Sequence, residues 1–193
     1  MHSNGFQVLV LDLYNHLKYI LMKSFALIFL LLVIAGCKQI MEVYNDAQEK
    51  IDVVHQYTDA VMKQDVATMK KLLADNYLSY GPALKTSVTK SQNISDWERG
   101  WKDRIVSMKY KRIHSSVINI EKGKLAGDWV SDWGEVTTIY KDGKSVKFWF
   151  NGLYKVEEGM ITEARVIYDN MDILTQLGYD FLPPSDFIQE YVN

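Results

Sequence analysis

The sequence contains little of several residue types, and each shortage excludes a class of protein. Its 193 residues include one cysteine, three prolines and eleven glycines. A single cysteine excludes an internal disulfide framework and a cysteine-rich metal site. The low proline and glycine content excludes a fibrous or linker-rich chain. The net charge is −2 at pH 7. The chain therefore lacks the excess of positive charge that binds a phosphate backbone, and nucleic acid is not an expected partner.

Recognisable catalytic and metal-binding motifs are also scarce. His55 and Asp59 are four residues apart, the spacing of a metal-binding pair on a helix, but no third ligand is evident. We therefore expect neither a metal site nor a cofactor. No G-x-S-x-G segment is present, so the nucleophile turn of an α/β-hydrolase is excluded. The composition, 48% hydrophobic and 24% charged, is typical of an ordinary globular domain.

A short apolar run lies near the N-terminus. Residues 25–35 read FALIFLLLVIA, with Lys23 shortly before them. As a helix this run spans about 16 Å, roughly half of the ~30 Å hydrocarbon core of a bilayer. It is too short for a membrane span but matches the apolar region of a secretory signal. The end of the run and the two residues after it, Ile34-Ala35-Gly36-Cys37, resemble the bacterial lipobox.

This resemblance implies that the chain is a lipoprotein. In such proteins the chain is cleaved before the cysteine, here Cys37, which receives acyl chains that anchor it stably to a membrane. We therefore expect a lipid-anchored protein of the bacterial cell envelope, and Lys38 after the cysteine favours the outer over the inner membrane. Asp12 does not suit a positively charged signal start, so either translation begins at Met22 or the first 21 residues are a dispensable extension. The alternative is a buried free cysteine at the end of a core helix.

The first part of the remaining chain has helical periodicity. Apolar residues recur with helical spacing at Val53, Val54, Tyr57, Ala60 and Val61. Asp65 is expected to cap a second helix, and a short strand follows at 77–80. The segment 95–98 fits a capping box, which predicts the start of a third helix.

After residue 107 the apolar period changes from 3.6 to 2. Strands are expected over 108–121, 124–140, 145–157 and 160–168, joined by tight turns that include Asp142-Gly143. A short helix is expected over 171–177. Helices followed by an antiparallel meander predict an α+β domain, in which three N-terminal helices pack on one face of a curved sheet.

This element order and its landmarks resemble a known superfamily. The landmarks are Val54-His55-Gln56-Tyr57, Asp65, Leu72-Leu73-Ala74-Asp75, Tyr80-Gly81-Pro82 and Gly159-Met160-Ile161. Over roughly residues 47–178 they are similar to the nuclear-transport-factor-2-like superfamily, which includes SnoaL-like polyketide cyclases and ketosteroid isomerase. The resemblance implies a cone-shaped sheet wrapped around the helices, with an apolar pocket at its wide end. The expected organisation is a signal region at 1–36, a lipidated tether at 37–46, this domain at 47–182 and a tail at 183–193.

The resemblance also bears on chemistry. Isomerase relatives use an Asp base together with Tyr and protonated Asp donors that stabilise an enolate. Tyr57 matches the oxyanion tyrosine of the isomerase. Gly81 and Gly152 stand where the isomerase has its two carboxylates, so a steroid-isomerase mechanism is not expected.

Other acidic residues lie on an expected strand. Asp128 and Asp132 share one of its faces, and Trp129, Trp133 and Glu135 share the other, because side chains alternate along a strand. The sequence leaves open which face lines the pocket. Inward tryptophans would make the pocket aromatic and neutral, whereas inward aspartates would make Asp132 a candidate base.

Three functions are consistent with these patterns. The first is a membrane-anchored lipoprotein whose pocket binds a small apolar or aromatic ligand. The second is an isomerase, cyclase or dehydratase that uses Tyr57 and Asp132 as catalytic residues. The third is a non-catalytic interaction module that forms a homodimer through the outer face of its sheet. The candidate pocket residues are Tyr57, Tyr80, Trp97, Trp101, Trp133, Trp149, Asn151, Arg165 and Tyr168.

Overall fold

The structure is a computed structural model that describes residues 18, 22–25 and 44–181. The chain divides into two compact units, Met1–Asp46 and Ala47–Asn193. In the first unit, residues 22–25 are helical. Cys37 and most of the expected signal region at 1–36 lie outside the described residues, as do most of the expected tether and the whole expected tail at 183–193. Within the described ranges, no helix is both long and apolar enough to cross a membrane.

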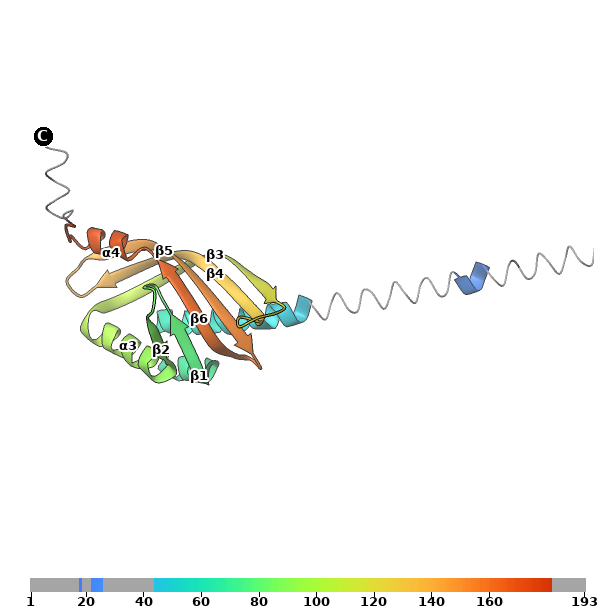
Figure 1. The fold of residues 1–193 in the computed structure, drawn as a ribbon. Coiled ribbons are helices and arrows are strands. Elements are labelled where there is room, and N and C mark those ends of the chain that lie inside the picture. Colours follow the sequence, from blue (N-terminus) through green and yellow to red (C-terminus); the bar gives the residue numbers. More distant parts are fainter. Residues whose placement is uncertain (1–17, 19–21, 26–43, 182–193) are drawn as a thin grey trace, which may run out of the picture. The chain divides into compact units, whose positions relative to one another are not determined.

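The second unit contains a meander of strands that is preceded in the chain by helices and followed by the short helix α4 (Figure 1). A helix covers residues 44–63. The elements that follow are α2 (Val66–Leu72), β1 (Leu73–Tyr80), β2 (Ser87–Thr89), α3 (Lys90–Asp103), β3 (Ile105–Ile120), β4 (Gly127–Tyr140), β5 (Ser145–Glu157), β6 (Met160–Tyr168) and α4 (Asn170–Gln176).

The six strands form one curved sheet in the order β2-β1-β6-β5-β4-β3. The predicted α+β class, with helices before a meander, is confirmed. Two features differ from the sequence-based expectation. Strand β2 was not predicted, and β1 runs parallel to β6, so the sheet is mixed rather than wholly antiparallel. Strands β1 and β6 are about 80 residues apart in the sequence. A pairing between such distant strands leaves no local sequence pattern from which it could be predicted.

The start of α3 was predicted incorrectly. The helix begins at Lys90 rather than near Ser95, because Thr89 and Gln92 form the capping box. The Thr89 hydroxyl accepts a hydrogen bond from the Gln92 amide, and the Gln92 side chain accepts one from the Thr89 amide. Both satisfy backbone groups that are unpaired at a helix start. Ser95 therefore lies inside the helix.

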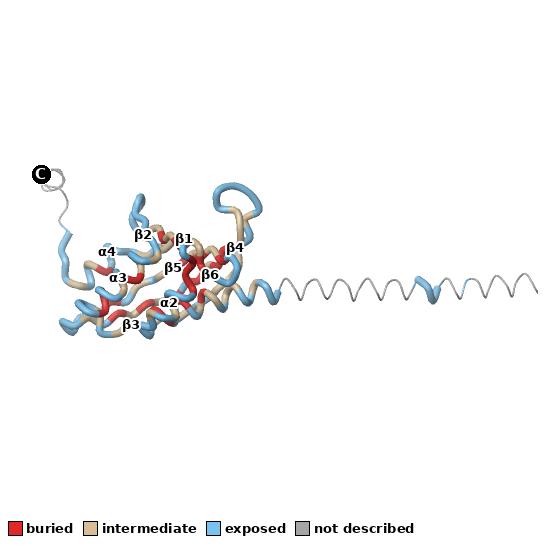
Figure 2. Tube along the Cα trace, turned by 90° about the horizontal axis from the view of Figure 1, so that it is seen from below, coloured by how far each residue is buried: buried red, intermediate tan, exposed pale blue. Residues whose placement is uncertain are grey.

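The core lies between the helices and the concave face of the sheet. Figure 2 shows the buried positions gathered along this layer. The helix over 44–63 contributes Val54 and Val61, which belong to the same buried cluster as Val130 on β4 and Ile161 on β6. Burial alternates along β4 and β5, because only one face of a strand can reach the core. Side chains in the same layer, between the helices and the sheet, also line a cavity.

Candidate ligand-binding cavity

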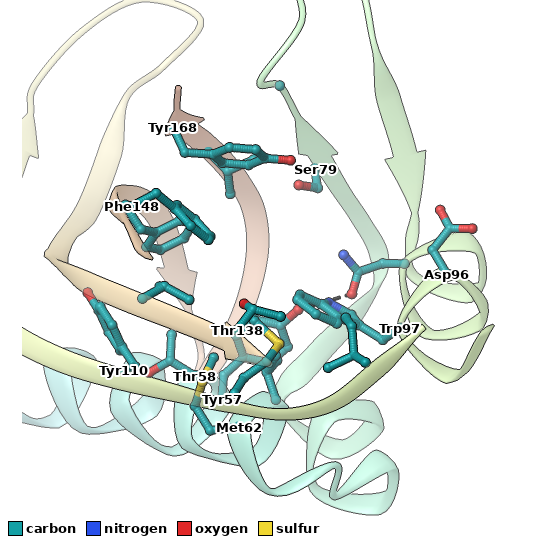
Figure 3. A pocket seen from close by; sticks show the side chains of 18 of the residues that line it. Tyr57, Thr58, Met62, Ser79, Asp96, Trp97, Tyr110, Thr138, Phe148 and Tyr168 are labelled. Carbon is teal, nitrogen blue, oxygen red and sulfur yellow. Dashed lines mark hydrogen bonds between the residues drawn. The ribbon is translucent and has the colours of Figure 1, made fainter. Parts of the chain in front are cut away.

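The cavity lies inside the curved sheet and has a volume of about 490 Å³. The helix over 44–63, α3 and α4 supply part of its wall, and the six strands with the segments beside them supply the rest. Figure 3 shows Phe148 and Tyr168 together on one side of the space, opposite Tyr57, Thr58 and Met62. This volume is in the usual range for small-molecule sites, about 300–1,000 Å³.

Aromatic rings make up much of the wall. Phe148 and Tyr168 pack together with their ring centres 5.6 Å apart. Tyr57 meets the edge of the Tyr154 ring at 6.1 Å. Trp97 lines the cavity and stacks on Trp101, which is buried behind it and is not part of the lining.

The polar atoms in the wall are mainly hydroxyl and amide groups. The Tyr57 hydroxyl donates a hydrogen bond to Oδ1 of Asn93 on α3, at 3.0 Å. Burial raises the pKa of Tyr57 well above its usual value, so this hydroxyl keeps its proton at physiological pH. Ser79 and Thr138 are buried in the same wall. The wall can therefore offer hydrogen bonds to a few polar atoms of an otherwise apolar ligand.

Cross-strand pairing shows which face of β4 points inward. Residues directly opposite one another on neighbouring strands lie on the same face of a sheet. Asp132 is opposite Gly152, and Gly152 is opposite Val166, which lines the cavity. Trp133 pairs with Asn151 on the neighbouring row and points to the other face. Of the two orientations that the sequence leaves open, the structure therefore has the aspartate inward.

Asp132 is nevertheless not part of the cavity wall. It is 0% exposed, and its Oδ1 accepts hydrogen bonds from Arg112 Nε at 3.1 Å and from Ser115 Oγ at 2.8 Å. His55 Nε2 lies 2.8 Å from the same Ser115 hydroxyl. The ring of Tyr154 lies over Gly152, the cross-strand neighbour of Asp132. The two candidate catalytic residues are thus not brought to one point: Tyr57 lines the cavity and Asp132 lies in a buried network beside it.

Both glycines at the isomerase carboxylate positions lack room for a side chain. At Gly81, φ is +99°, and an added Cβ would lie 2.3 Å from the carbonyl oxygen of Val166. At Gly152, an added Cβ would lie 2.5 Å from the Tyr154 ring. The backbone at Gly81 and the aromatic ring over Gly152 therefore require glycine at these positions.

Apart from Trp101, which is buried on α3, the other candidate pocket residues lie on the outer face of the sheet. Trp133, Trp149 and Asn151 line a shallow hollow there, with the two indole centres 6.3 Å apart. Arg165 pairs across strands with Tyr80 and lies over its ring at 4.9 Å. Arg165 also forms an ion pair with Glu163 at 2.7 Å. Of the nine candidate pocket residues, Tyr57, Trp97 and Tyr168 line the cavity.

Several lining residues were not singled out from the sequence. They include Asn93, Arg104, Tyr110, Thr138 and Tyr154. Asn93 lies on α3, and Arg104 lies between α3 and β3. The strands of Tyr110, Thr138 and Tyr154 were predicted, but the face on which each of these side chains lies depends on register across the sheet. No signal in the sequence identified the inward face of β4, because the burial of Asp132 is known only from the structure. Within the described ranges, no three His, Cys, Asp or Glu side chains group as a metal site.

Comparison with known proteins supports this fold. The family model of the SnoaL-like polyketide cyclases matches residues 51–177. A search of curated proteins finds no match. Among solved structures, an LEH-like epoxide hydrolase of M. tuberculosis is 20% identical, with a TM-score of 0.55 over 68% of this chain and 91% of that chain.

Two further structures are similar. IdmH of Streptomyces antibioticus, a proposed polyketide cyclase, is 18% identical with a TM-score of 0.55, covering 67% of this chain and 99% of its own. An NTF2-like protein of unknown function from Burkholderia pseudomallei is 15% identical with a TM-score of 0.54, covering 68% and 98%. At these identities the similarity shows the fold alone. Domains of this type bind ligands or act as cyclases or isomerases. The match over residues 51–177 shows that the chain belongs to the SnoaL-like polyketide cyclase family.

Proposed function

We propose that this domain binds a small, largely aromatic molecule in its cavity. The observation that carries the proposal is the cavity itself: about 490 Å³, walled by aromatic rings and containing a few hydrogen-bonding groups. An apolar wall stabilises a ligand by removing its surface from water, at about 25 cal/mol per Å². The Tyr57 and Asn93 pair would then fix its orientation.

Binding is favoured over turnover as the primary role. An isomerase, cyclase or dehydratase needs a base within hydrogen-bonding reach of the reacting atom. Asp132 is not in the cavity wall, and its Oδ1 accepts hydrogen bonds from Arg112 and Ser115. The Tyr57 hydroxyl donates its hydrogen bond to Asn93. The family membership keeps a cyclase-type reaction as the alternative, with Tyr57 as the group that would meet the substrate.

We also propose that the domain is held at a bacterial membrane through Cys37. The lipobox-like segment that ends at this cysteine supports this location. A domain anchored in this way would meet its ligand at the cell envelope.

The binding proposal can be tested by native mass spectrometry of the full chain purified from its own host. We expect an additional mass that is lost on denaturation. A Met108→Trp variant, which fills the cavity from β3, should lose this mass completely. Met160→Trp is the matched control, because Met160 is exposed at the start of β6 and does not line the cavity. A bare wild-type mass, or a bound mass that survives in Met108→Trp, would contradict the proposal.

A further inference from the structure

Arg104 gives the cavity an unbalanced charge. Among the described lining residues it is the one with a positively charged side chain. Its guanidinium forms no ion pair or side-chain hydrogen bond with another described residue. The acidic lining residue, Asp96, instead forms an ion pair with Arg99 on the exposed side of α3. The cavity therefore presents an uncompensated positive charge to a ligand.

Other hydrogen-bond donors gather at the same end of the domain. Arg104 directly precedes β3, whose first residue pairs with Tyr140 at the end of β4. Burial raises the pKa of Tyr140, and the Arg104 guanidinium is near enough to oppose this shift. Tyr168 ends β6, Asn170 begins α4, and both line the cavity. Burial also raises the pKa of Tyr168, so its hydroxyl remains a donor.

We propose that the ligand is an aromatic carboxylate, held by Arg104 with its ring system against the aromatic wall. This inference rests on the proposed binding function and names the chemical class of the ligand. A guanidinium binds a carboxylate through two parallel hydrogen bonds, and neighbouring phenol and amide groups add neutral donors. Arg104 is exposed, so water screens part of this attraction and the neighbouring donors share in holding the carboxylate. No described lining carboxylate is free to compete for Arg104, because Asp96 is already paired.

The test compares two ligands of nearly equal shape. Binding of 2-naphthoate and of its neutral counterpart 2-naphthamide is measured by isothermal titration calorimetry on the full chain in lipid nanodiscs. We expect naphthoate to bind about tenfold more tightly, the lower range for a hydrogen bond to a charged group that is partly exposed. Arg104→Gln should remove this preference and leave naphthamide affinity unchanged. Arg104→Lys should retain part of the preference, because the charge remains but the planar fork is lost.

Arg99→Gln is the matched control, since Arg99 lies on α3 and does not line the cavity. It should leave both affinities unchanged. Unchanged naphthamide binding by Arg104→Gln also shows that the variant is folded. Equal wild-type affinity for the two ligands, or a preference that survives in Arg104→Gln, would overturn the carboxylate inference while leaving aromatic binding intact. Failure of both ligands to bind would count against the carboxylate inference and the binding function together.

Discussion

The two candidate catalytic residues show how surroundings decide what a side chain can do. Tyr57 and Asp132 are both almost fully buried. The Tyr57 ring and hydroxyl face the cavity, where a ligand can reach them. Asp132 Oδ1 accepts hydrogen bonds from Arg112 and Ser115, so the Arg112 charge compensates the carboxylate inside the protein, while the buried Oδ2 has no hydrogen-bond partner among the described residues. A buried carboxylate held in this way orders its neighbours, because removal of either partner would leave an unpaired buried group.

His55 belongs to the same network and makes stability depend on pH. Burial lowers the pKa of His55, and the Arg112 guanidinium lowers it further, against the opposing effect of Asp132. The folded protein thus binds this proton less tightly than the unfolded chain, whose histidine titrates at about 6.5. Stability from neutral His55 is complete above that value and decreases as the pH falls below it.

We therefore expect the wild-type melting temperature to fall between pH 7.5 and 5, and to fall less in His55→Gln. Thermal unfolding followed by circular dichroism over this range provides the measurement. Subtracting the variant's pH profile from that of the wild type removes the contribution of titrating carboxylates elsewhere. Parallel profiles for the two proteins would show that His55 does not contribute to this dependence.

The choice between inward tryptophans and inward aspartates on β4 could not be made at the level of single residues. Both sets alternate, and both contain groups that line pockets in other proteins. The difference comes from neighbours: Arg112 and Ser115 on β3 neutralise and bind Asp132. Trp133 has Trp149 and Asn151 beside it on the outer face. These partners are brought together only when the sheet forms.

At the scale of elements, the cap of α3 carries a specific consequence. This helix supplies Asn93 and Trp97 to the cavity, and its first turn is held by Thr89 and Gln92. Replacing a Thr cap by Ala typically costs about 1 kcal/mol. Thr89→Ala should lower the free energy of unfolding by about this amount, measured by urea denaturation.

Ser95→Ala is the matched control for the cap. Ser95 is exposed inside α3, where alanine is the better helix former, so this change should leave stability unchanged or slightly raised. A loss of stability in Ser95→Ala with none in Thr89→Ala would place the cap at the position expected from the sequence instead.

Local turns and long-range pairs differ in how well they were predicted. Strands β5 and β6 have the expected limits, because Asp142-Gly143 and Glu158-Gly159 end one strand and begin the next. Gly143 has φ of +84°, a conformation that glycine adopts without strain. In contrast, β2 has three residues and forms only by pairing with β1. Its sequence carries too little alternation to predict a strand.

At the scale of the domain, the sheet has two distinct faces. The concave face and its helices enclose the cavity. The outer face bears an apolar group in which Trp149 and Ile167 are 63% and 62% exposed. Apolar residues exposed side by side are typical of interaction surfaces. Homodimerisation through this face remains a prediction.

The position of the whole protein in the cell depends on Cys37. We expect the full chain to incorporate labelled palmitate and to sediment with membranes in its own host. Cys37→Ser should lose both properties, because the acylated residue is absent. Release of folded protein into the soluble fraction would accompany this loss. Equal labelling of the wild type and Cys37→Ser would refute lipidation at this residue.

The sequence alone determined the α+β class, the order of the helices and the limits of the last two strands. These properties depend on apolar periodicity and turn residues, which act over short distances along the chain. Only the tertiary structure decided that β1 pairs with β6, that Asp132 is paired in the interior and that the Arg104 side chain has no ion-pair partner among the described residues. These outcomes depend on which strands become neighbours, because contacts between residues distant in sequence exist only after the chain has folded.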